Sequence, residues 1–423
     1  MFRLIIISLL FLLLSPLEAK RLSYWQVQNM PKSVEKDYYI WRFLSQSTTT
    51  SNEAKNIILE ANNLNKKLRV AYKNRTGFPA PKIKKSRDVT PDHIWKRRSV
   101  ANKHFKEGLA LLRKKNKHLA VKYFEVAKRN YIKRHQKDKA LFWLYLSTKN
   151  RKYLTELRKS YHPNLYTLMA ADTVKGKYPK TITQKIRRKR ISGFDSKDPI
   201  AWTKIKEKMK RSSNSTIDKM ASKYASQESI GIYTYLKAKA SEHRKSYFPM
   251  PYRDVMKTMS PQRQALIYAI ARQESRFVPA SVSRSFALGM MQFMPFLIEH
   301  IAKEKGQKMD LDDMFDPYKA IEYADYHLNY LNKYLYHPLF IAYAYNGGIG
   351  FTKRHITNRK HFRKGAYEPY MSMETMKNVE AREYGKKVLA NYVIYLNKLG
   401  VSTRIFPLLK SLATPYKTDK FRR

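Results

Sequence analysis

One glutamate in this sequence stands where its neighbours could make it a proton donor. Apolar residues precede Glu274 by seven, four and three positions, at Ile267, Ile270 and Ala271. This spacing places all four residues on one face of a helix. Apolar neighbours take water away from a carboxylate and so raise its pKa. A carboxyl group that keeps its proton near pH 7 can act as general acid in glycosidic-bond cleavage. The spacing alone also allows a glutamate at a helix end that turns toward solvent.

Three further motifs follow Glu274 in order. They are GMMQFMP at 289–295, AYAYNGG at 342–348, and VEAREY at 379–384, which leads into VLANY at 388–392. Together with the pair Glu274-Ser275, this ordered set resembles the soluble lytic transglycosylase family, whose catalytic domain is related to goose-type lysozyme. The resemblance covers about residues 248–398.

The chain departs from the family's motifs at Met290, Phe293, Gly347, Ala381 and Gly385. Gly347 stands where the family has alanine, a change that we expect to be tolerated sterically. We also expect Gly347, Gly348 and Gly350 to form a tight turn at positive φ, which glycine adopts without a steric penalty.

The resemblance implies cleavage of the β-1,4 bond between N-acetylmuramic acid and N-acetylglucosamine in peptidoglycan. Glu274 would protonate the bridging oxygen while the substrate's own acetamido oxygen stabilises C1. The same glutamate would then take the proton of the muramoyl 6-hydroxyl, which closes a 1,6-anhydro ring without consuming water. A retaining hydrolase would instead need a second carboxylate about 5 Å away. Asp312, Asp313 and Asp316 stay open as candidates, because folding could bring one of them close.

The matched motifs also supply candidates for substrate binding. Gln292 carries an amide that both donates and accepts hydrogen bonds, which suits acetamido and hydroxyl groups. Met291 could form a soft apolar wall against a sugar ring. Ser275 is expected to bond the backbone or to support Glu274. The alternative for these residues is ordinary helix packing.

The last two motifs add four more candidates. The resemblance implies that the Tyr345 hydroxyl lies near the acetamido group and that the Asn346 amide bonds substrate. Glu380 would bond sugar hydroxyls, and Tyr384 would line the same cleft. An exposed helix surface is the alternative for Glu380.

Other catalytic and metal-binding patterns are absent from the sequence. It contains no GxSxG elbow, no GxxxxGK phosphate loop and no HExxH pair. The 11 histidines show no ligand spacing, so we expect no metal role for His327 or His337 and no cofactor. Because the chain has no cysteine, disulfides, thiol catalysis and iron–sulfur clusters are excluded.

The start of the chain is typical of an exported protein. Arg3 precedes an apolar run at 4–14, and Ala19 is a small residue before Lys20. The run is shorter than the ~20 residues that a membrane-spanning helix needs. We therefore predict a signal peptide over residues 1–19, cleavage near Ala19 and a periplasmic location. A buried first helix and an uncleaved anchor are the alternatives.

The chain is strongly basic, with 85 Lys and Arg against 33 Asp and Glu and a net charge of +52. Such a surface attracts polyanions, and for an exported protein the negatively charged glycan strands of peptidoglycan are the expected partner. Other cell-wall enzymes are further candidate partners. The run KIRRKR at 185–190 resembles a nucleic-acid patch. That interpretation fits badly with export, so we favour a solvated basic face and expect no nucleic-acid partner.

Strand-like alternation is scarce, which predicts an all-α protein. Residues 20–247 are expected to form a helical scaffold in which Ala101, Phe105 and Leu112 recur nineteen residues later as Ala120, Phe124 and Tyr131. This period indicates solenoid-like repeats, with chance similarity among amphipathic helices as the alternative. The region also loosely resembles the superhelical scaffold of large soluble lytic transglycosylases.

Residues 248–400 are the predicted lysozyme-like catalytic domain, entered through an extended, proline-fixed linker at 247–252. Helices are expected over 261–276, from residue 316 onward, and over 380–399. Residues 401–423 are expected to be a loose basic tail.

The leading functional hypothesis is an exported peptidoglycan lytic transglycosylase. A lysozyme-like muramidase that hydrolyses the same bond is one alternative. A wall-binding scaffold with a weak or idle site is the other.

Overall fold

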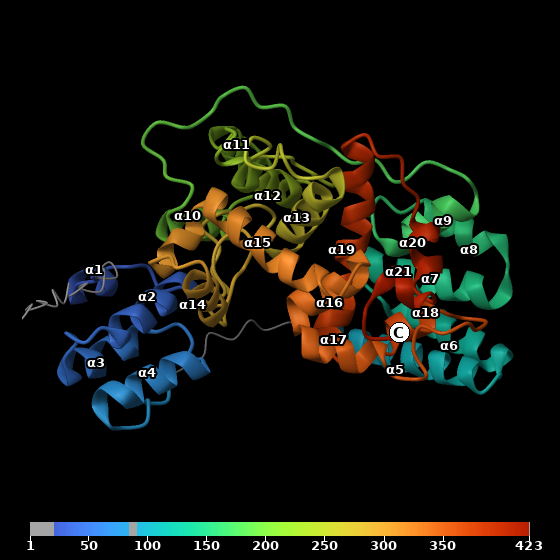
Figure 1. The fold of residues 1–423 in the computed structure, drawn as a ribbon, viewed down its shortest axis with the longest axis horizontal. Coiled ribbons are helices and arrows are strands. Elements are labelled where there is room, and N and C mark those ends of the chain that lie inside the picture. Colours follow the sequence, from blue (N-terminus) through green and yellow to red (C-terminus); the bar gives the residue numbers. More distant parts are fainter. Residues whose placement is uncertain (1–20, 84–90, 423) are drawn as a thin grey trace, which may run out of the picture.

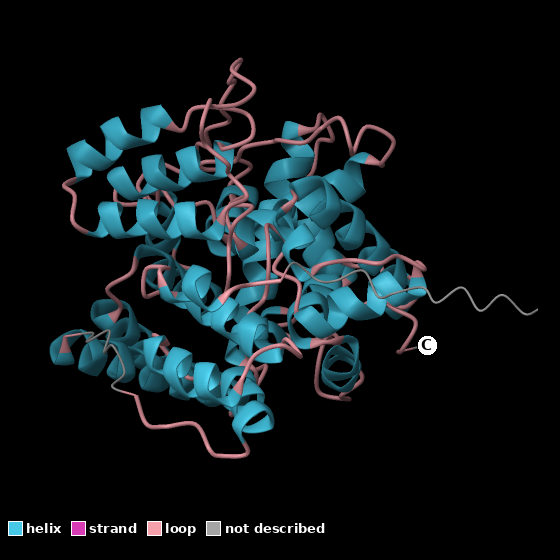
Figure 2. Ribbon diagram, turned by 90° about the vertical axis from the view of Figure 1, so that its left-hand side faces the viewer, coloured by secondary structure: helices cyan, strands magenta, loops and turns pink. Residues whose placement is uncertain are grey.

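The computed structural model describes residues 21–83 and 91–422, so the predicted signal peptide at 1–19 lies outside the described residues. Every named element in these two ranges is a helix, and residue pairing of the β type is limited to isolated bridges. Figure 2 shows helices joined by loops throughout the described chain. The predicted all-α fold class is confirmed. None of the helices in the described ranges is long and apolar enough to cross a membrane.

The chain before residue 248 forms three groups of helices. The first group contains α1 (Tyr24–Gln28), α2 (Val34–Ser45), α3 (Ser51–Ile57), η1 (Ile58–Glu60) and α4 (Lys66–Thr76). The second contains α5 (Asp92–Arg113), α6 (Lys117–Asn130), α7 (Arg134–Thr148), α8 (Arg151–Arg158) and α9 (Leu165–Thr173). The third contains α10 (Pro199–Lys210), α11 (Asn214–Lys223) and α12 (Ile230–Ala240). In Figure 1 the three groups lie around the helices that follow them, at the lower left, the right and the top.

The predicted repeat falls on the second group, where consecutive helices pack against each other. Phe105, Phe124 and Trp143 come from α5, α6 and α7, and their rings form one cluster with centroids 5.4 and 5.9 Å apart in that order. A Cβ at Gly108 would stand 2.6 Å from the Phe124 ring, so the glycine permits the close approach of α5 and α6. All six repeat positions named from the sequence are buried.

The three groups are attached to the rest of the protein by apolar and polar contacts. One hydrophobic core joins α1–α9 with the helices after residue 248, and a second joins α10–α12 with Val278 and Ala280. Arg42 of α2 forms ion pairs with Asp310 at 2.8 Å and with Asp312 at 2.9 Å. The helical scaffold therefore borders the later helices directly.

The C-terminal half contains α13 (Pro261–Glu274), α14 (Pro295–Glu304), η2 (Leu311–Phe315), α15 (Pro317–Asn332), α16 (Pro338–Gly347), α17 (Ile349–Ile356), α18 (Tyr370–Glu374) and α19 (Val379–Lys398). The Ser260 side chain caps α13 by accepting from the Arg263 amide, as predicted, and the helix ends at Glu274. Asp316 caps α15 through the amides of Tyr318 and Lys319. α13 packs against α19, which also packs against α16.

The segment predicted as a linker is packed into the core. Phe248 has no exposed surface, and its ring lies 5.2 Å from that of Tyr395. The Tyr395 hydroxyl donates to the carbonyl of Pro249 at 3.1 Å, and the Tyr268 hydroxyl donates to that of Pro251 at 2.8 Å. Apolar burial and these two hydrogen bonds fix the entry to α13.

The expectation of a loose C-terminal tail is wrong. The tail forms α20 (Ile405–Ser411) and α21 (Pro415–Thr418), and Ile405, Leu409 and Leu412 are buried. The amide of Lys420 donates to the carbonyl of Tyr334 at 2.8 Å. The many lysines and arginines suggested solvation, but the apolar residues between them are enough to hold the segment against the domain.

Candidate functional site

Glu274 is the last residue of α13, a helix whose residues from Ala265 to Ala271 are all buried. The Glu274 side chain is half-buried, and its Oε1 accepts a hydrogen bond of 2.7 Å from the Tyr384 hydroxyl. Burial raises the pKa of Glu274 to about 7; the Tyr384 hydrogen bond lowers it, and the charge of Glu380 raises it. The negative end of the helix dipole also disfavours a carboxylate at this position. The predicted rise in the pKa of this glutamate is thus borne out by its surroundings.

The chain reverses sharply after Glu274. Arg276 and Phe277 both adopt left-handed backbone conformations, at φ of 56° and 66°, which non-glycine residues rarely adopt. Phe277 is buried beneath the turn. The Ser275 hydroxyl donates to the carbonyl of Met290 at 2.8 Å, so it joins the helix end to the loop that carries the second motif. Ser275 bonds the backbone, as we expected.

The second motif forms a tight loop beneath the site. Gly289 has φ of 74°, and a Cβ there would stand 1.9 Å from the Met314 carbonyl oxygen. The Gln292 amide nitrogen donates to the carbonyls of Ser281 at 3.1 Å and Gly289 at 2.9 Å. Only the side-chain carbonyl of Gln292 is left to accept a bond from a ligand. Met291 has no exposed surface, so its side chain packs in the core and forms no wall of the site.

Two tyrosines come together at Glu274 from different helices. Tyr384 of α19 donates to the carboxylate, and Tyr345 of α16 donates to the carbonyl of Met291 at 3.0 Å. Burial, and secondly the charge of Glu274, raise the pKa of both tyrosine hydroxyls well above the usual value. Both hydroxyls therefore remain protonated donors in the pH range in which Glu274 titrates.

The remaining candidates lie at the edge of this arrangement. Glu380 is exposed in the first turn of α19, close enough for its charge to act on Glu274. Asn346 is half-buried directly after Tyr345. The structure thus groups Glu274 with Tyr345, Tyr384 and Glu380, and it places Met291 beneath them.

The aspartates considered as a second carboxylate are engaged elsewhere. Asp312 forms an ion pair with Arg42, and Asp313 accepts from the amide of Asp310. Asp316 caps α15. Among residues 21–83 and 91–422, Glu380 is the carboxylate whose charge raises the pKa of Glu274.

The glycines that depart from the family's pattern have packing roles. Gly348 has φ of 84°, but Gly347 and Gly350 are not at positive φ, so the expected turn at all three positions is wrong. A Cβ at Gly347 would stand 2.9 Å from the Phe351 ring. At Gly385 a Cβ would stand 2.2 Å from the Tyr343 ring. Because glycine has no side chain, α16 and α19 can approach each other closely at this position beside the site.

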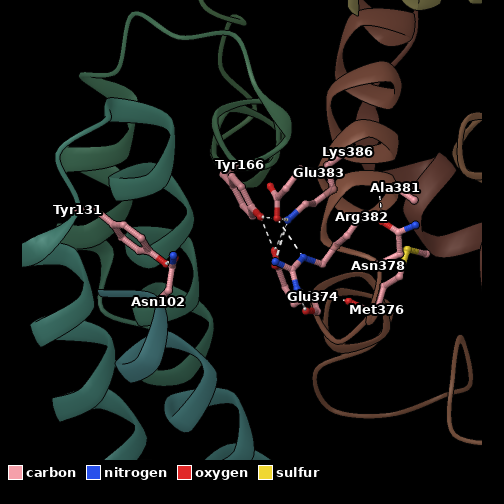
Figure 3. Close-up of polar contacts among 10 residues, drawn as sticks. All are labelled: Asn102, Tyr131, Tyr166, Glu374, Met376, Asn378, Ala381, Arg382, Glu383 and Lys386. Atoms are coloured by element: carbon pink, nitrogen blue, oxygen red, sulfur yellow. Dashed lines mark hydrogen bonds and ion pairs between the residues drawn. The ribbon is translucent and has the colours of Figure 1, made fainter. Parts of the chain in front are cut away.

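A buried cluster of charged residues, which was not predicted from the sequence, holds α19 in place behind the site (Figure 3). Lys386 donates to both oxygens of Glu374, to Glu383 and to the Tyr166 hydroxyl, each at 3.0 Å. Tyr166 of α9 also donates to Glu374. Arg382 pairs with Glu383 at 3.1 Å, and the cationic neighbours lower the pKa of Glu383, although burial alone would raise it. We call these five residues the Lys386 cluster.

The cluster connects the scaffold to the site. Figure 3 shows Tyr166 reaching from α9 toward Lys386 and Glu374. Lys386 is two residues after Tyr384 on the same helix. The pair Glu383 and Lys386, three residues apart on a predicted helix, was the signal available in the sequence. The partners Glu374 and Tyr166, which are 12 and 220 positions from Lys386, could not be named from local spacing.

The two histidines named from the sequence, His327 and His337, make packing and helix-capping contacts. His337 caps α16 by accepting from the Leu339 amide at 3.1 Å, and its other ring nitrogen donates to the Leu408 carbonyl. His327 lies against Tyr345 with ring centroids 5.6 Å apart. Within residues 21–83 and 91–422, no group of three His, Asp or Glu side chains could hold a metal ion.

Comparisons with known proteins agree with the motifs. Residues 253–367 match the family model described as Transglycosylase SLT domain. The soluble lytic murein transglycosylase of Escherichia coli (strain K12) is 27% identical over 183 residues, which are 40% of this chain and 27% of that protein. The chain spans about a quarter of the length of the curated relatives it matches.

Solved structures of low sequence identity are also similar. The 70 kDa soluble lytic transglycosylase from Escherichia coli is 17% identical with a TM-score of 0.47, over 90% of this chain and 62% of that one. An inactive mutant of the lytic transglycosylase Slt from Pseudomonas aeruginosa is 16% identical with a TM-score of 0.46, over 90% and 63%. The match over residues 253–367 is the finding that identifies the domain: this chain contains a transglycosylase SLT domain, and its resemblance to the soluble lytic transglycosylases is confirmed.

Proposed function

We propose that this chain is an exported peptidoglycan lytic transglycosylase. It cleaves the β-1,4 bond between N-acetylmuramic acid and N-acetylglucosamine and leaves 1,6-anhydromuramoyl ends. The observation that carries the proposal is the Glu274 carboxyl group, whose pKa is raised to about 7 by burial at the end of α13. Near neutral pH such a group exists in both protonation states, as a residue that acts first as acid and then as base requires.

In the first step, protonated Glu274 gives its proton to the bridging oxygen. The bond between that oxygen and the muramoyl C1 breaks, and the N-acetylglucosamine part leaves as an alcohol. The substrate's acetamido oxygen bonds to C1 and takes up the positive charge. The Tyr384 hydroxyl donates to the carboxylate that Glu274 has become.

In the second step, the Glu274 carboxylate takes the proton of the muramoyl 6-hydroxyl. The 6-oxygen attacks C1, and the acetamido oxygen is released from C1. Glu274 is protonated again, and no water is consumed. Proton transfer of this kind contributes about 10²–10⁴-fold in rate.

The surrounding residues bind the sugars. We assign Gln292, through its free carbonyl, and Asn346, through its amide, to the acetamido and hydroxyl groups. Tyr345 and Tyr384 line the cleft beside the acetamido group, and Glu380 bonds sugar hydroxyls. Ser275 and the backbone at Met291 hold the loop under the site.

The rest of the chain supports this domain. We propose that residues 20–247 are the scaffold, that 248–400 form the catalytic domain, and that residues 1–19 direct export to the periplasm. The substrate partner is the glycan strand of peptidoglycan, which fits a net charge of +52 and the word murein in the name of the relatives. Other cell-wall enzymes are further partners of the same compartment.

Mass spectrometry of the products tests the proposal. Digestion of purified sacculi by the wild-type chain should release muropeptides with anhydro ends, which are lighter by one water than the products of hydrolysis. Glu274→Gln should release none while still binding sacculi. Reducing ends instead of anhydro ends would establish a muramidase, and undiminished cleavage by the variant would refute the assignment of Glu274. Binding without cleavage by the wild type would establish a wall-binding scaffold.

A further inference from the structure

A line of aromatic rings leads from the candidate site to the C-terminal segment. It runs from Tyr345 to His327, Tyr330, Tyr334 and Phe421, with successive ring centroids 5.6, 6.2, 5.9 and 5.6 Å apart. We call these five rings the aromatic track. Its first ring belongs to Tyr345, a residue of the candidate site whose hydroxyl pKa is raised by burial and by the charge of Glu274, so the track begins at the site.

Helix periodicity explains the middle of the track. His327, Tyr330 and Tyr334 are spaced by three and four residues on α15 and beyond its end, which places them on one side. Leu328 and Leu331 occupy the buried side. The side that carries the rings is partly turned to solvent: Tyr330 is exposed, His327 is half-buried, and Tyr334 also packs against the core.

The C-terminal segment supplies the far end of the track. The Phe421 ring lies parallel to that of Tyr334, with 6° between the planes, and the Lys420 amide bonds the Tyr334 carbonyl. These contacts attach the C-terminal segment to the rest of the protein, and this attachment accounts for the stacking of Phe421 on Tyr334. They do not explain Tyr330, which is 41% exposed between two ring neighbours.

The track has the chemistry of a sugar-binding surface. Aromatic faces offer flat apolar area to the C–H faces of sugar rings. Burial lowers the pKa of His327 to about 4, so its imidazole is neutral near pH 7. Exposed lysines stand beside the track: Lys333 is on the same segment, and the Lys353 Nζ lies 5.3 Å from the Phe421 ring centroid. Their charge suits the carboxylates that peptide stems carry along a glycan strand.

We propose that the aromatic track binds the glycan strand beyond the sugars held at the cleaved bond. This inference rests on the proposed function and adds a set of outer sugar positions to it. Tyr330 is the second ring beyond Tyr345, so a substrate with one sugar on each side of the cleaved bond does not reach it. Long strands gain stacking on the outer rings, so the enzyme distinguishes substrates by length.

Kinetics on strands of two lengths tests the inference. The substrates are a stem-free disaccharide of N-acetylmuramic acid and N-acetylglucosamine and long stem-free strands of the same alternating sugars. Tyr330→Ala should lower kcat/KM on long strands by about tenfold, through KM, because one stacked ring is lost. The disaccharide should be cleaved at the wild-type rate, and Tyr330→Phe, which keeps the ring, should match the wild type on both.

Tyr416 supplies a matched control, because it is 65% exposed and lies outside the track. Tyr416→Ala should match the wild type on both substrates. The track is refuted if Tyr330→Ala cleaves long strands as well as the wild type, or if it loses activity equally on both lengths.

A binding measurement keeps this inference separate from the proposed function. In the Glu274→Gln background, long stem-free strands should bind about tenfold more weakly once Tyr330→Ala is added. If the wild type releases no anhydro ends but this difference in binding is found, the proposed function is refuted and the binding role of the aromatic track is supported. If anhydro ends form but Tyr330→Ala changes neither binding nor KM, the binding role of the aromatic track is refuted and the proposed function is supported.

Discussion

The Tyr384 hydroxyl lies 2.7 Å from Oε1 of Glu274 and connects α19 to the end of α13. The hydrogen bond stabilises the carboxylate form of a group that burial otherwise keeps protonated. Glu274 is thereby held between the two states that acid and base steps need.

Removal of the Tyr384 hydroxyl should raise the pKa of Glu274 further. In Tyr384→Phe, the fall in kcat/KM with rising pH, which follows deprotonation of the acid, should move to higher pH. At neutral pH kcat should fall about tenfold, since a hydrogen bond to a charged group contributes about 1.5–3 kcal/mol. The pH profile of sacculus digestion measures both effects, and an unmoved profile would contradict the role of this hydroxyl.

Removal of the charge at Glu380 should have the opposite effect. Its carboxylate raises the pKa of Glu274, so Glu380→Gln should move the same limb of the pH profile to lower pH. Glu299→Gln removes an equal charge from an exposed position on α14 and serves as the control. The two active-site variants should therefore shift the profile in opposite directions. A shift in the same direction for both would contradict the electrostatic account.

The raised pKa of Glu274 also predicts a pH-dependent stability. Between the unfolded value of 4.5 and the folded value of about 7, the folded chain binds more protons than the unfolded chain. The free energy of unfolding contributed by this group therefore falls as pH rises through that window. Glu274→Gln should raise Tm by about a few degrees at pH 8 and leave it near the wild-type value at pH 4. Equal Tm differences at both pH values in calorimetry would rule out a shifted carboxyl group.

The Lys386 cluster should contribute strongly to stability. Lys386→Met leaves Glu374 buried without its cation, which costs about 3–5 kcal/mol in the free energy of unfolding. Lys377→Met, at an exposed position nearby, is the matched control. Adding Glu374→Gln to Lys386→Met should recover part of the loss. No recovery in a denaturant titration would show that the lysine acts through packing alone.

Local patterns in the sequence predicted the parts of the fold that depend on near neighbours. Ser260 before Pro261 located the start of α13, and apolar spacing placed Glu274 on its buried face. The nineteen-residue repeat located α5 and α6, because these two helices are consecutive in the chain and pack on each other.

Contacts between distant residues could not be predicted in this way. Lys386 and Tyr166 are 220 positions apart, and their meeting depends on how α9 packs on α19. Gly385 departs from the family's motif because the Tyr343 ring occupies the space that a side chain would need. Composition was misleading for the tail, where Ile405 and Leu409 outweigh the surrounding charge.

The most direct test of the account is a titration of the Glu274 carboxyl group itself. In the intact chain with 13C-labelled glutamate side chains, the resonance that disappears in Glu274→Gln identifies the group. The account predicts that this resonance titrates near pH 7, well above the ordinary value of 4.5. Titration at the ordinary value would mean that the site holds no proton donor at neutral pH, and the proposed mechanism would be wrong.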